Sequence, residues 1–292
     1  MTNALLYAAT VLFWGTSWLA IKFQLGIVAP EVSIVYRFAA SALVMLAVCL
    51  VTRRRLRFSW REHVFMAAQG LCLFSTNYLL LYQATRFLTS GLVAVAFSTI
   101  TVITIALGAL FFGFPVRPRV AAAAACGLVG IGLVFWPEIR AFDLAAGGSL
   151  GLALALGGTA SAATGMLMSA RNQRAGLPVI PNNAWSMAYG FLFITLYAGA
   201  RGLPFTFDPS PAYVISLLYL AVGATVIGFW TYLTLVGRIG PDRAAYASVL
   251  FPIVALTLST LFEGFAWTPL ALGGVVLVLA GNALVLIARS RA

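Results

Sequence analysis

The stretch LTSGLVAVAFSTITVITIALGALFF, residues 88–112, runs for 25 residues without a charged side chain. A helix needs about 20 apolar residues to cross the hydrocarbon core of a bilayer, so this segment is long enough to span it. It also lacks the strict alternation of apolar and polar residues that strands of a membrane barrel show. The stretch therefore predicts a membrane-spanning α-helix.

The same pattern continues along most of the chain. Of the 292 residues, 62% are hydrophobic and 9% are charged, so charged side chains are too few to cover a soluble protein of this length. We expect ten spans joined by short connections with proline or glycine, at residues 4–21, 32–51, 64–82, 88–112, 120–136, 150–169, 184–200, 212–236, 244–262 and 269–287. The predicted fold class is all-α and integral to the membrane, with ten transmembrane helices and no soluble domain.

Charged residues alternate between successive connections. If both termini are cytoplasmic, that side holds 13 arginines and two acids, whereas the other side, span ends included, holds five basic and five acidic residues. We assign Lys22 and Arg37 to that outer side, at span ends. Because basic residues are retained on the cytoplasmic side, we expect cytoplasmic termini in a multi-pass protein of the bacterial inner membrane, surrounded by membrane lipid. Nucleic-acid binding requires a soluble basic surface, so we expect no nucleic-acid partner.

Side chains for metal binding or catalysis are scarce. Cys49, Cys72 and Cys126 fall inside predicted spans among small apolar residues, where a thiol usually serves packing. The single histidine, His63, adjoins a basic connection, and neither a CxxC motif nor a cluster of acids with a nucleophile is present. We expect no metal, no cofactor and no enzymatic activity.

The chain contains a weak internal repeat. Residues 107–114, LGALFFGF, have a counterpart roughly 150 residues later in residues 258–265, LSTLFEGF. Duplication of a five-span unit inverts the second copy in the membrane, as in many secondary transporters. We therefore predict two inverted five-helix repeats, residues 1–145 and 146–292, around a central cavity. Duplicated apolar helices can also serve packing alone, so that alternative stays open.

Three short motifs resemble a known family. They are LFWGTSW at residues 12–18, YQA at 82–84, and FP at 251–252 followed by LFEG at 261–264. The pattern is similar to that of ten-span drug/metabolite transporters of the EamA type over the full length. Asn77-Tyr78 with Tyr82 is most similar to bacterial exporters of aromatic and other amino acids. The first half has Phe112-Gly113-Phe114 where this family often has Gly-Glu, so no symmetric role follows for Glu263.

That resemblance implies export of amino acids from the cytoplasm, with broad specificity for aromatic and other neutral ones, by alternating access. The substrate would be a small molecule. An exporter of drugs or other small metabolites and a channel remain alternatives, as does a structural subunit. A carrier of cationic drugs would be expected to place an acid inside the membrane, and no predicted span has an acid in its middle.

Aromatic residues suggest where an amino acid would bind. Trp14, Trp18 and Lys22 are spaced four apart and share one face of a helix. Ring faces attract an ammonium group and also suit apolar side chains, although aromatic stripes also form packing and interfacial belts. The polar Asn77 should face a cavity or a neighbouring helix. The predicted substrate-binding residues are Trp14, Trp18, Asn77, Tyr78, Tyr82, Trp185, Tyr189 and Trp230.

Backbone features suggest gating and packing positions. Pro252 interrupts the ninth span and can free backbone groups for binding or merely kink the helix. Gly165 in the sixth span is a candidate hinge. Glycines in the fifth and tenth spans allow close helix contact, either within the chain or in a homodimer; they are Gly127, Gly130, Gly132, Gly273, Gly274 and Gly281.

No titratable acid is predicted at mid-membrane. Glu31 and Glu263 lie at outer span ends, where end-capping or a surface ion pair is the expected role. We therefore expect facilitated export or exchange rather than proton-coupled transport.

Overall fold

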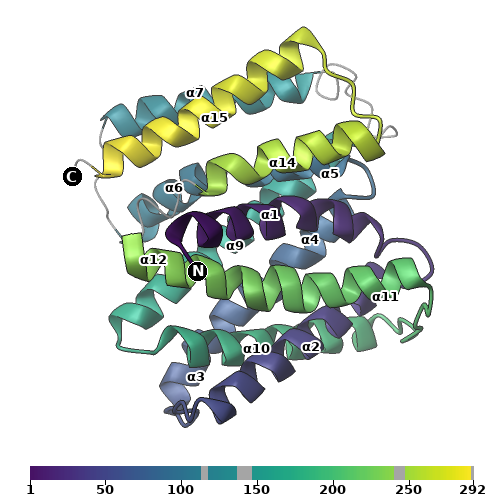
Figure 1. The fold of residues 1–292 in the computed structure, drawn as a ribbon, viewed down its shortest axis with the longest axis vertical. Helices are drawn as coiled ribbons and strands as arrows, with labels where there is room; N and C mark the ends of the chain where they lie inside the picture. Colours follow the sequence, from purple (N-terminus) through teal and green to yellow (C-terminus); the bar gives the residue numbers. More distant parts are fainter. Residues whose placement is uncertain (113–117, 137–146, 240–246, 291–292) are drawn as a thin grey trace.

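The chain folds into a bundle of helical rods (Figure 1). The structure is a computed structural model that describes residues 1–112, 118–136, 147–239 and 247–290. Those residues contain no strand, so the predicted all-α fold class is confirmed. The helices are α1 (Asn3–Lys22), α2 (Pro30–Val51), α3 (Trp60–Leu71), η1 (Cys72–Thr76), α4 (Asn77–Ala84), α5 (Ser90–Phe97), α6 (Ile100–Phe112), α7 (Pro118–Val134), α9 (Gly148–Arg174), α10 (Val179–Ala200), α11 (Pro211–Leu218), η2 (Tyr219–Ile227), α12 (Gly228–Ile239), α14 (Ala247–Phe262) and α15 (Pro269–Ser290).

Several of these helices join end to end, so that the described residues form ten rods. Continuous rods are made by α3, η1 and α4, by α5 and α6, and by α11, η2 and α12. The ten rods match the ten predicted spans in order. The predicted boundary between the halves, 145/146, and the departure at Gly113-Phe114 lie outside the described residues.

The rods suit a membrane. Large apolar side chains are exposed on the outside of the bundle, among them Leu43, Ile215 and Leu261. In hydrocarbon such a surface is favourable, whereas in water it would aggregate. By length and composition, six helical stretches of the described chain can cross a bilayer: Asn3–Lys22, Pro30–Val51, Trp60–Ala84, Ser90–Phe111, Gly148–Arg174 and Pro211–Tyr232. Shorter apolar helices accompany them at Ala121–Val134, Leu250–Phe262 and Pro269–Leu284.

The start of α10 differs from the prediction. The helix begins at Val179 rather than at residue 184, because Asn182 and Asn183 lie within it instead of in a connection. Their amides are buried against Gln69 of α3 and Asn172 of α9. Asn182 Nδ2 donates to Gln69 Oε1 at 2.8 Å, and Gln69 Nε2 donates to Asn183 Oδ1 at 3.0 Å. Asn172 Nδ2 donates to the oxygens of Gln69 and Asn182 at 3.1 Å. These four amides, the amide cluster, hold α3, α9 and α10 together.

A second polar cluster lies toward the opposite end of the bundle. Gln24, just after α1, donates from Nε2 to Ser216 Oγ at 2.6 Å and to the Tyr213 carbonyl at 3.0 Å. Ser33 of α2 and the Tyr213 hydroxyl share a hydrogen bond of 2.9 Å. This cluster joins α1 and α2 to α11, as the amide cluster joins α9 and α10 to α3. Each therefore ties a pair of consecutive rods to a rod from the other half of the chain.

Two rods contain π-helical segments. At the end of η1 the Asn77 backbone N–H donates to the Cys72 carbonyl, and at the end of η2 the Gly228 backbone N–H donates to the Gly223 carbonyl. Both bonds reach five residues back, which widens the helix and often marks a functional position.

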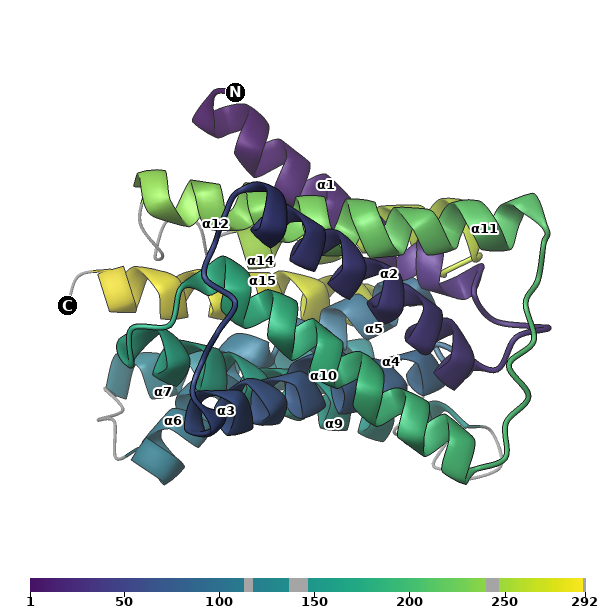
Figure 2. The same ribbon diagram turned by 90° about the horizontal axis from the view of Figure 1, so that it is seen from below.

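Helices α7 and α15 make the most extensive contact between two helices of the described chain (Figures 1 and 2). A Cβ added to Gly130 would lie 2.6 Å from the Gly274 carbonyl oxygen, and one added to Gly274 would lie 2.6 Å from the Gly130 carbonyl oxygen. A Cβ on Gly281 would lie 2.7 Å from the Gly127 nitrogen. Glycine at these positions therefore lets two helices of one chain touch through their backbones. The homodimer stays a prediction.

Substitution of adjacent glycines on α15 should separate packing from helix propensity. Gly274→Ala forces a Cβ into the α7 backbone, and we expect a loss of about 1–3 kcal/mol in stability. Gly273→Ala is the matched control, because a Cβ there meets nothing within 4 Å and alanine favours a helix. Thermal unfolding in detergent measures both. Equal melting temperatures in the two variants would contradict the observed packing.

Candidate functional site

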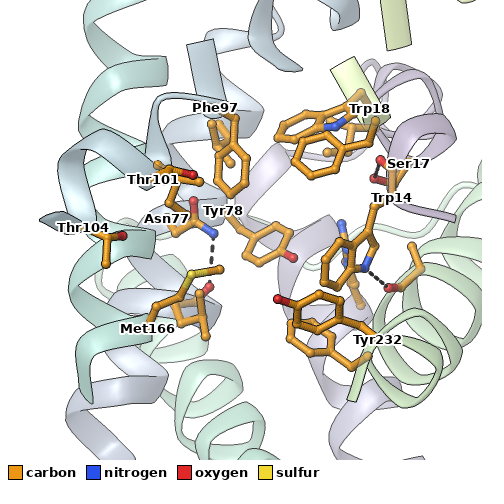
Figure 3. A pocket seen from close by; sticks show the side chains of 18 residues that line it. Trp14, Ser17, Trp18, Asn77, Tyr78, Phe97, Thr101, Thr104, Met166 and Tyr232 are labelled. Carbon is orange, nitrogen blue, oxygen red and sulfur yellow. Dashed lines mark hydrogen bonds between the residues drawn. The ribbon is translucent and has the colours of Figure 1, made fainter. Parts of the chain in front are cut away.

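The middle of the bundle contains a cavity of about 270 Å³. Helices from both ends of the sequence line it, including α1, α2, α4, α6, α9, α12 and α14. Aromatic rings make up much of the wall: Trp14, Trp18, Tyr78, Phe97, Phe229, Tyr232 and Phe251. In Figure 3, Tyr78 extends into the space between Asn77 on one side and Trp14 on the other.

Four of the predicted binding residues line this cavity: Trp14, Trp18, Asn77 and Tyr78. Trp14 is fixed by a hydrogen bond from Nε1 to the Ala224 carbonyl at 3.1 Å and by ring contacts with Phe229 and Tyr232. The Trp18 ring lies 5.1 Å from that of Phe97. The stripe predicted on the first helix thus faces the interior rather than forming an interfacial belt.

Two polar atoms of these residues have no partner in the described structure. Asn77 Nδ2 donates to the Leu73 carbonyl at 3.2 Å, but Asn77 Oδ1 is buried without a donor. Trp18 Nε1 is buried without an acceptor. A buried polar atom without a partner is unfavourable, so both are available to a bound molecule.

The other predicted binding residues lie outside the cavity. Tyr82 is fully buried beside it and accepts from Arg37 Nη1 at 3.4 Å. Trp185 and Tyr189 pack around His63, with Tyr189 OH 3.0 Å from His63 Nδ1 and Trp185 Nε1 donating to the Leu56 carbonyl. Trp230 is 51% exposed on the outer face of α12. Helical periodicity shows which aromatic residues share a face of one helix, but it does not show which helix faces meet in the folded bundle.

The predicted gating residues lie next to the cavity without lining it. Pro252 falls inside α14, directly after the lining residue Phe251. Gly165 precedes the lining residue Met166, and a Cβ on it would lie 2.6 Å from Leu73 Cβ, so this glycine brings α9 close to η1. The structure thus gives Gly165 a packing role, and its role as a hinge stays a prediction.

Arg37 lines the cavity, although the sequence did not predict it as a binding residue. It was assigned to the outer surface, at a span end, whereas its side chain is 2% exposed inside the bundle. The guanidinium lies 4.5 Å from the Tyr78 ring centre and donates from Nη2 to Thr225 Oγ1 at 3.2 Å. The sequence does contain a signal for an interior position, because Arg37 is the sole charged residue within the predicted span 32–51.

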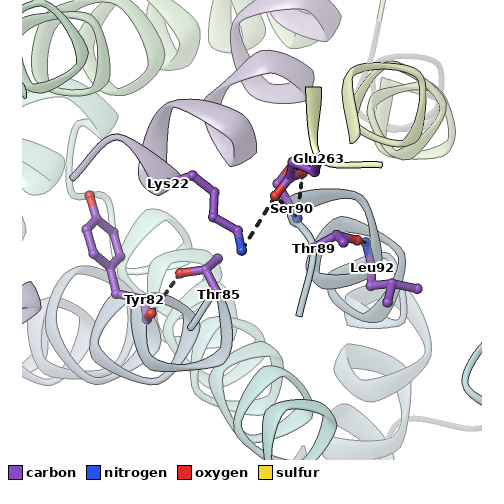
Figure 4. A network of polar contacts seen from close by, with 7 residues as sticks. All are labelled: Lys22, Tyr82, Thr85, Thr89, Ser90, Leu92 and Glu263. Carbon is purple, nitrogen blue, oxygen red and sulfur yellow. Dashed lines mark hydrogen bonds and ion pairs between the residues drawn. The ribbon is translucent and has the colours of Figure 1, made fainter. Parts of the chain in front are cut away.

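An ionic network lies at the end of the bundle near Lys22 (Figure 4). Glu263, after α14, lies 3.5 Å from Lys22 Nζ. The same carboxylate accepts from the Ser90 amide at 2.9 Å and from the Ser90 hydroxyl. It therefore caps α5 and links α1, α5 and α14. This matches the expectation of end-capping and an ion pair for Glu263.

Comparison with known proteins identifies the family. The model of the EamA-like transporter family matches this chain twice, over residues 1–136 and 149–287. This chain belongs to the EamA-like transporter family. An EamA-like transporter is not an enzyme, and the described residues hold no group of three or more His, Cys, Asp or Glu side chains that could bind a metal.

Relatives within the family include two named "Probable amino-acid metabolite efflux pump". The one from Salmonella typhimurium (strain LT2) is 26% identical over 93% of this chain and 90% of its own length. The one from Escherichia coli (strain K12) is 25% identical over 96% and 93%. An uncharacterized inner membrane transporter of Escherichia coli (strain K12) is 27% identical over 92% and 86%. A solved crystal structure covers 99% of this chain and 98% of its own with a TM-score of 0.68 at 19% identity, which shows a shared fold.

The ionic network of this EamA-like transporter predicts an order of stability. Glu263→Gln weakens charge-assisted bonds to Ser90 and removes the ion pair, whereas Lys22→Met removes the ion pair alone. Bonds to a charged group contribute about 1.5–3 kcal/mol, and a partly exposed ion pair contributes less than about 1 kcal/mol. We expect Glu263→Gln to lower the melting temperature in detergent more than Lys22→Met does. Equal losses in the two variants would show that the ion pair, rather than the cap, stabilises this end, and a larger loss in Lys22→Met would contradict the expected order.

Proposed function

We propose that this transporter exports amino acids, aromatic and other neutral ones, from the cytoplasm by alternating access. The observation that carries the proposal is the aromatic cavity in the centre of a membrane-spanning bundle, with unpaired polar atoms in its wall. The names of the two efflux-pump relatives agree with this substrate class.

The cavity suits a small zwitterion. Its volume of about 270 Å³ is near the lower end of ligand pockets, which span roughly 300–1,000 Å³, and so fits a small metabolite better than a drug-sized molecule. Ring faces such as that of Tyr78 can hold an ammonium by cation–π attraction and can also pack against an apolar side chain. Asn77 Oδ1 supplies a free acceptor for the same ammonium.

The cavity wall contains no carboxylate among its described residues. A carrier of cationic drugs is expected to place an acid there. This feature therefore favours an amino-acid exporter over a cationic-drug exporter.

Two inverted repeats, residues 1–145 and 146–292, would provide the alternating access. The double match of the family model supports a duplication. Corresponding rods pack against each other: α2 against α10, α5 against α14, and α7 against α15. The two polar clusters join corresponding sets of rods toward opposite ends of the bundle, as inverted copies require. Rocking of the repeats would then expose the cavity to each side in turn.

Transport down the gradient of the amino acid, by facilitated export or exchange, fits the position of the acids. Glu263 lies at one end of the bundle, engaged by Lys22 and Ser90, and Glu31 accepts from Gln83 Nε2 at 3.1 Å. Neither lines the cavity. A proton-coupling group exposed to both sides is therefore absent from the described part of the wall.

The orientation can be tested by labelling. With both termini cytoplasmic, tags at the two ends should react with a membrane-impermeant reagent only after cells are permeabilised, because the basic connections stay inside. A tag on the connection at residues 203–210 should react in intact cells. Labelling of the terminal tags in intact cells would reverse the proposed orientation.

Substitutions in the cavity wall should impair transport in liposomes. We expect Trp18→Ala and Tyr78→Leu to reduce saturable counterflow of L-phenylalanine about tenfold, because each removes a ring from the cavity. Trp230→Ala is the matched control, since this exposed tryptophan lies outside the cavity.

The same assay separates the alternatives. A channel gives flux that does not saturate, a structural subunit gives no flux, and an exporter of drugs or other small metabolites gives counterflow with those solutes alone. Undiminished counterflow in both cavity variants would place the site elsewhere.

A further inference from the structure

Arg37 is the one charged side chain among the described residues of the cavity wall. It lies seven residues after Pro30, the first residue of α2, and therefore about 10 Å along the helix from that end. Its side chain is 2% exposed. A charge at this depth in a membrane protein is unfavourable and is usually retained because it has a function.

The guanidinium is only partly satisfied by the protein. Its five N–H donors make three bonds: Nε and Nη2 donate to Thr225 Oγ1 at 3.4 and 3.2 Å, and Nη1 donates to Tyr82 OH at 3.4 Å. All three are long, and all the acceptors are neutral hydroxyls. Two donors are thus left over in a group that faces a cavity.

No carboxylate of the described chain neutralises this charge. The ion pair that the described residues contain joins Lys22 and Glu263. Two further acids lie toward the same end: Glu31 accepts from Gln83, and Asp208 accepts from the Ser210 backbone N–H. The cavity therefore carries one positive charge with free donors, a combination that attracts an anion.

We infer that Arg37 binds the carboxylate of the transported amino acid, an inference that rests on the proposed function. The fork of a guanidinium matches the two oxygens of a carboxylate, and such charge-assisted pairs are among the strongest hydrogen bonds in proteins. Asn77 Oδ1 is left for the ammonium group, and the aromatic rings contact the side chain. This division explains broad specificity, because the protein recognises the groups that all amino acids share.

A purely structural role accounts for only part of the arrangement. Through Tyr82 and Thr225, Arg37 does connect α2 to α4 and to the π-helical segment η2. A neutral glutamine or asparagine could make such bonds without placing a charge in the membrane. A carboxylate ligand explains the unpaired charge of Arg37, whereas a purely structural role does not.

Comparison of an amino acid with its amide tests the inference. L-Phenylalaninamide keeps the ring and the amino group of L-phenylalanine but replaces the carboxylate by a neutral amide. Uptake of each radiolabelled compound is measured separately in liposomes that contain the wild-type transporter. We expect L-phenylalanine to be preferred by about tenfold or more in apparent affinity. Equal affinities in the wild type would overturn the inference without any variant.

Variants of Arg37 assign the preference to this side chain. Arg37→Met should lower uptake of L-phenylalanine about tenfold and leave uptake of L-phenylalaninamide largely unchanged. Arg37→Lys keeps the charge but loses the fork, so an intermediate preference is expected. A folded Arg37→Met protein in which both uptakes fall together, or neither falls, contradicts carboxylate binding by Arg37.

Removal of the partners of Arg37 controls for a structural role. Thr225→Val and Tyr82→Phe each delete an acceptor of the guanidinium but leave the charge in place. We expect both to lower the melting temperature and to retain the preference for L-phenylalanine over its amide. Loss of that preference in these variants would instead assign it to the positioning of the helices.

These experiments distinguish failure of the proposed function from failure of the role inferred for Arg37. If the wild-type protein exports no amino acid in saturable fashion, amino-acid export is wrong and the inference falls with it. If amino acids and their amides are exported equally, amino-acid export stands and the role of Arg37 is wrong.

Discussion

In hydrocarbon, a polar group has no water to bond, so the protein itself must supply its partner. This constraint organises the structure. Backbone groups are satisfied within helices, and most hydroxyls inside the rods donate to a carbonyl of their own helix, as Thr159 does to Ala155 at 2.7 Å. Amides that cannot do so gather in clusters, such as that of Gln69, Asn172 and Asn182. Polar side chains therefore join several of the rods, alongside the packing of apolar and small residues such as Gly130 and Gly274.

The cavity wall contains polar groups without a hydrogen-bond partner, which are exceptions to this rule. Trp18 Nε1, Asn77 Oδ1 and two donors of Arg37 lack partners in one shared space. Single unpartnered atoms also occur elsewhere in the described chain, such as Gln24 Oε1 in the second polar cluster and Asn282 Nδ2. Unpaired buried groups are unfavourable, so a molecule that supplied their missing partners would gain affinity and selectivity from this difference. The wall is also built from different parts of the chain, since Trp14 contacts Ala224 and Phe251 from the second half. A relative movement of the halves would therefore change the shape of the site.

The π-helical segments lie where such a change would act. η1 directly precedes Asn77 and Tyr78, and η2 holds Thr225, the acceptor for Arg37. Such widened turns occur frequently at functional sites. At the end of the bundle near Lys22, the Glu263 carboxylate links three rods through Lys22 and Ser90.

The sequence by itself determined the class of protein and the order of its ten helices. The length and apolarity of a segment are local properties, and they decide whether that segment can span a bilayer. The sequence also predicted Trp14, Trp18, Asn77 and Tyr78 as binding residues, from helical spacing and from the polarity of Asn77, and these four line the cavity. It could not determine which faces converge, and so Trp185, Tyr189 and Trp230 were grouped with them although they lie elsewhere. Only the tertiary structure placed Arg37 in the cavity and Asn182 in a buried cluster. Whether a polar residue is at a span end or in a site depends on how the rods pack, and packing joins residues such as Arg37 and Thr225 that lie far apart in the chain.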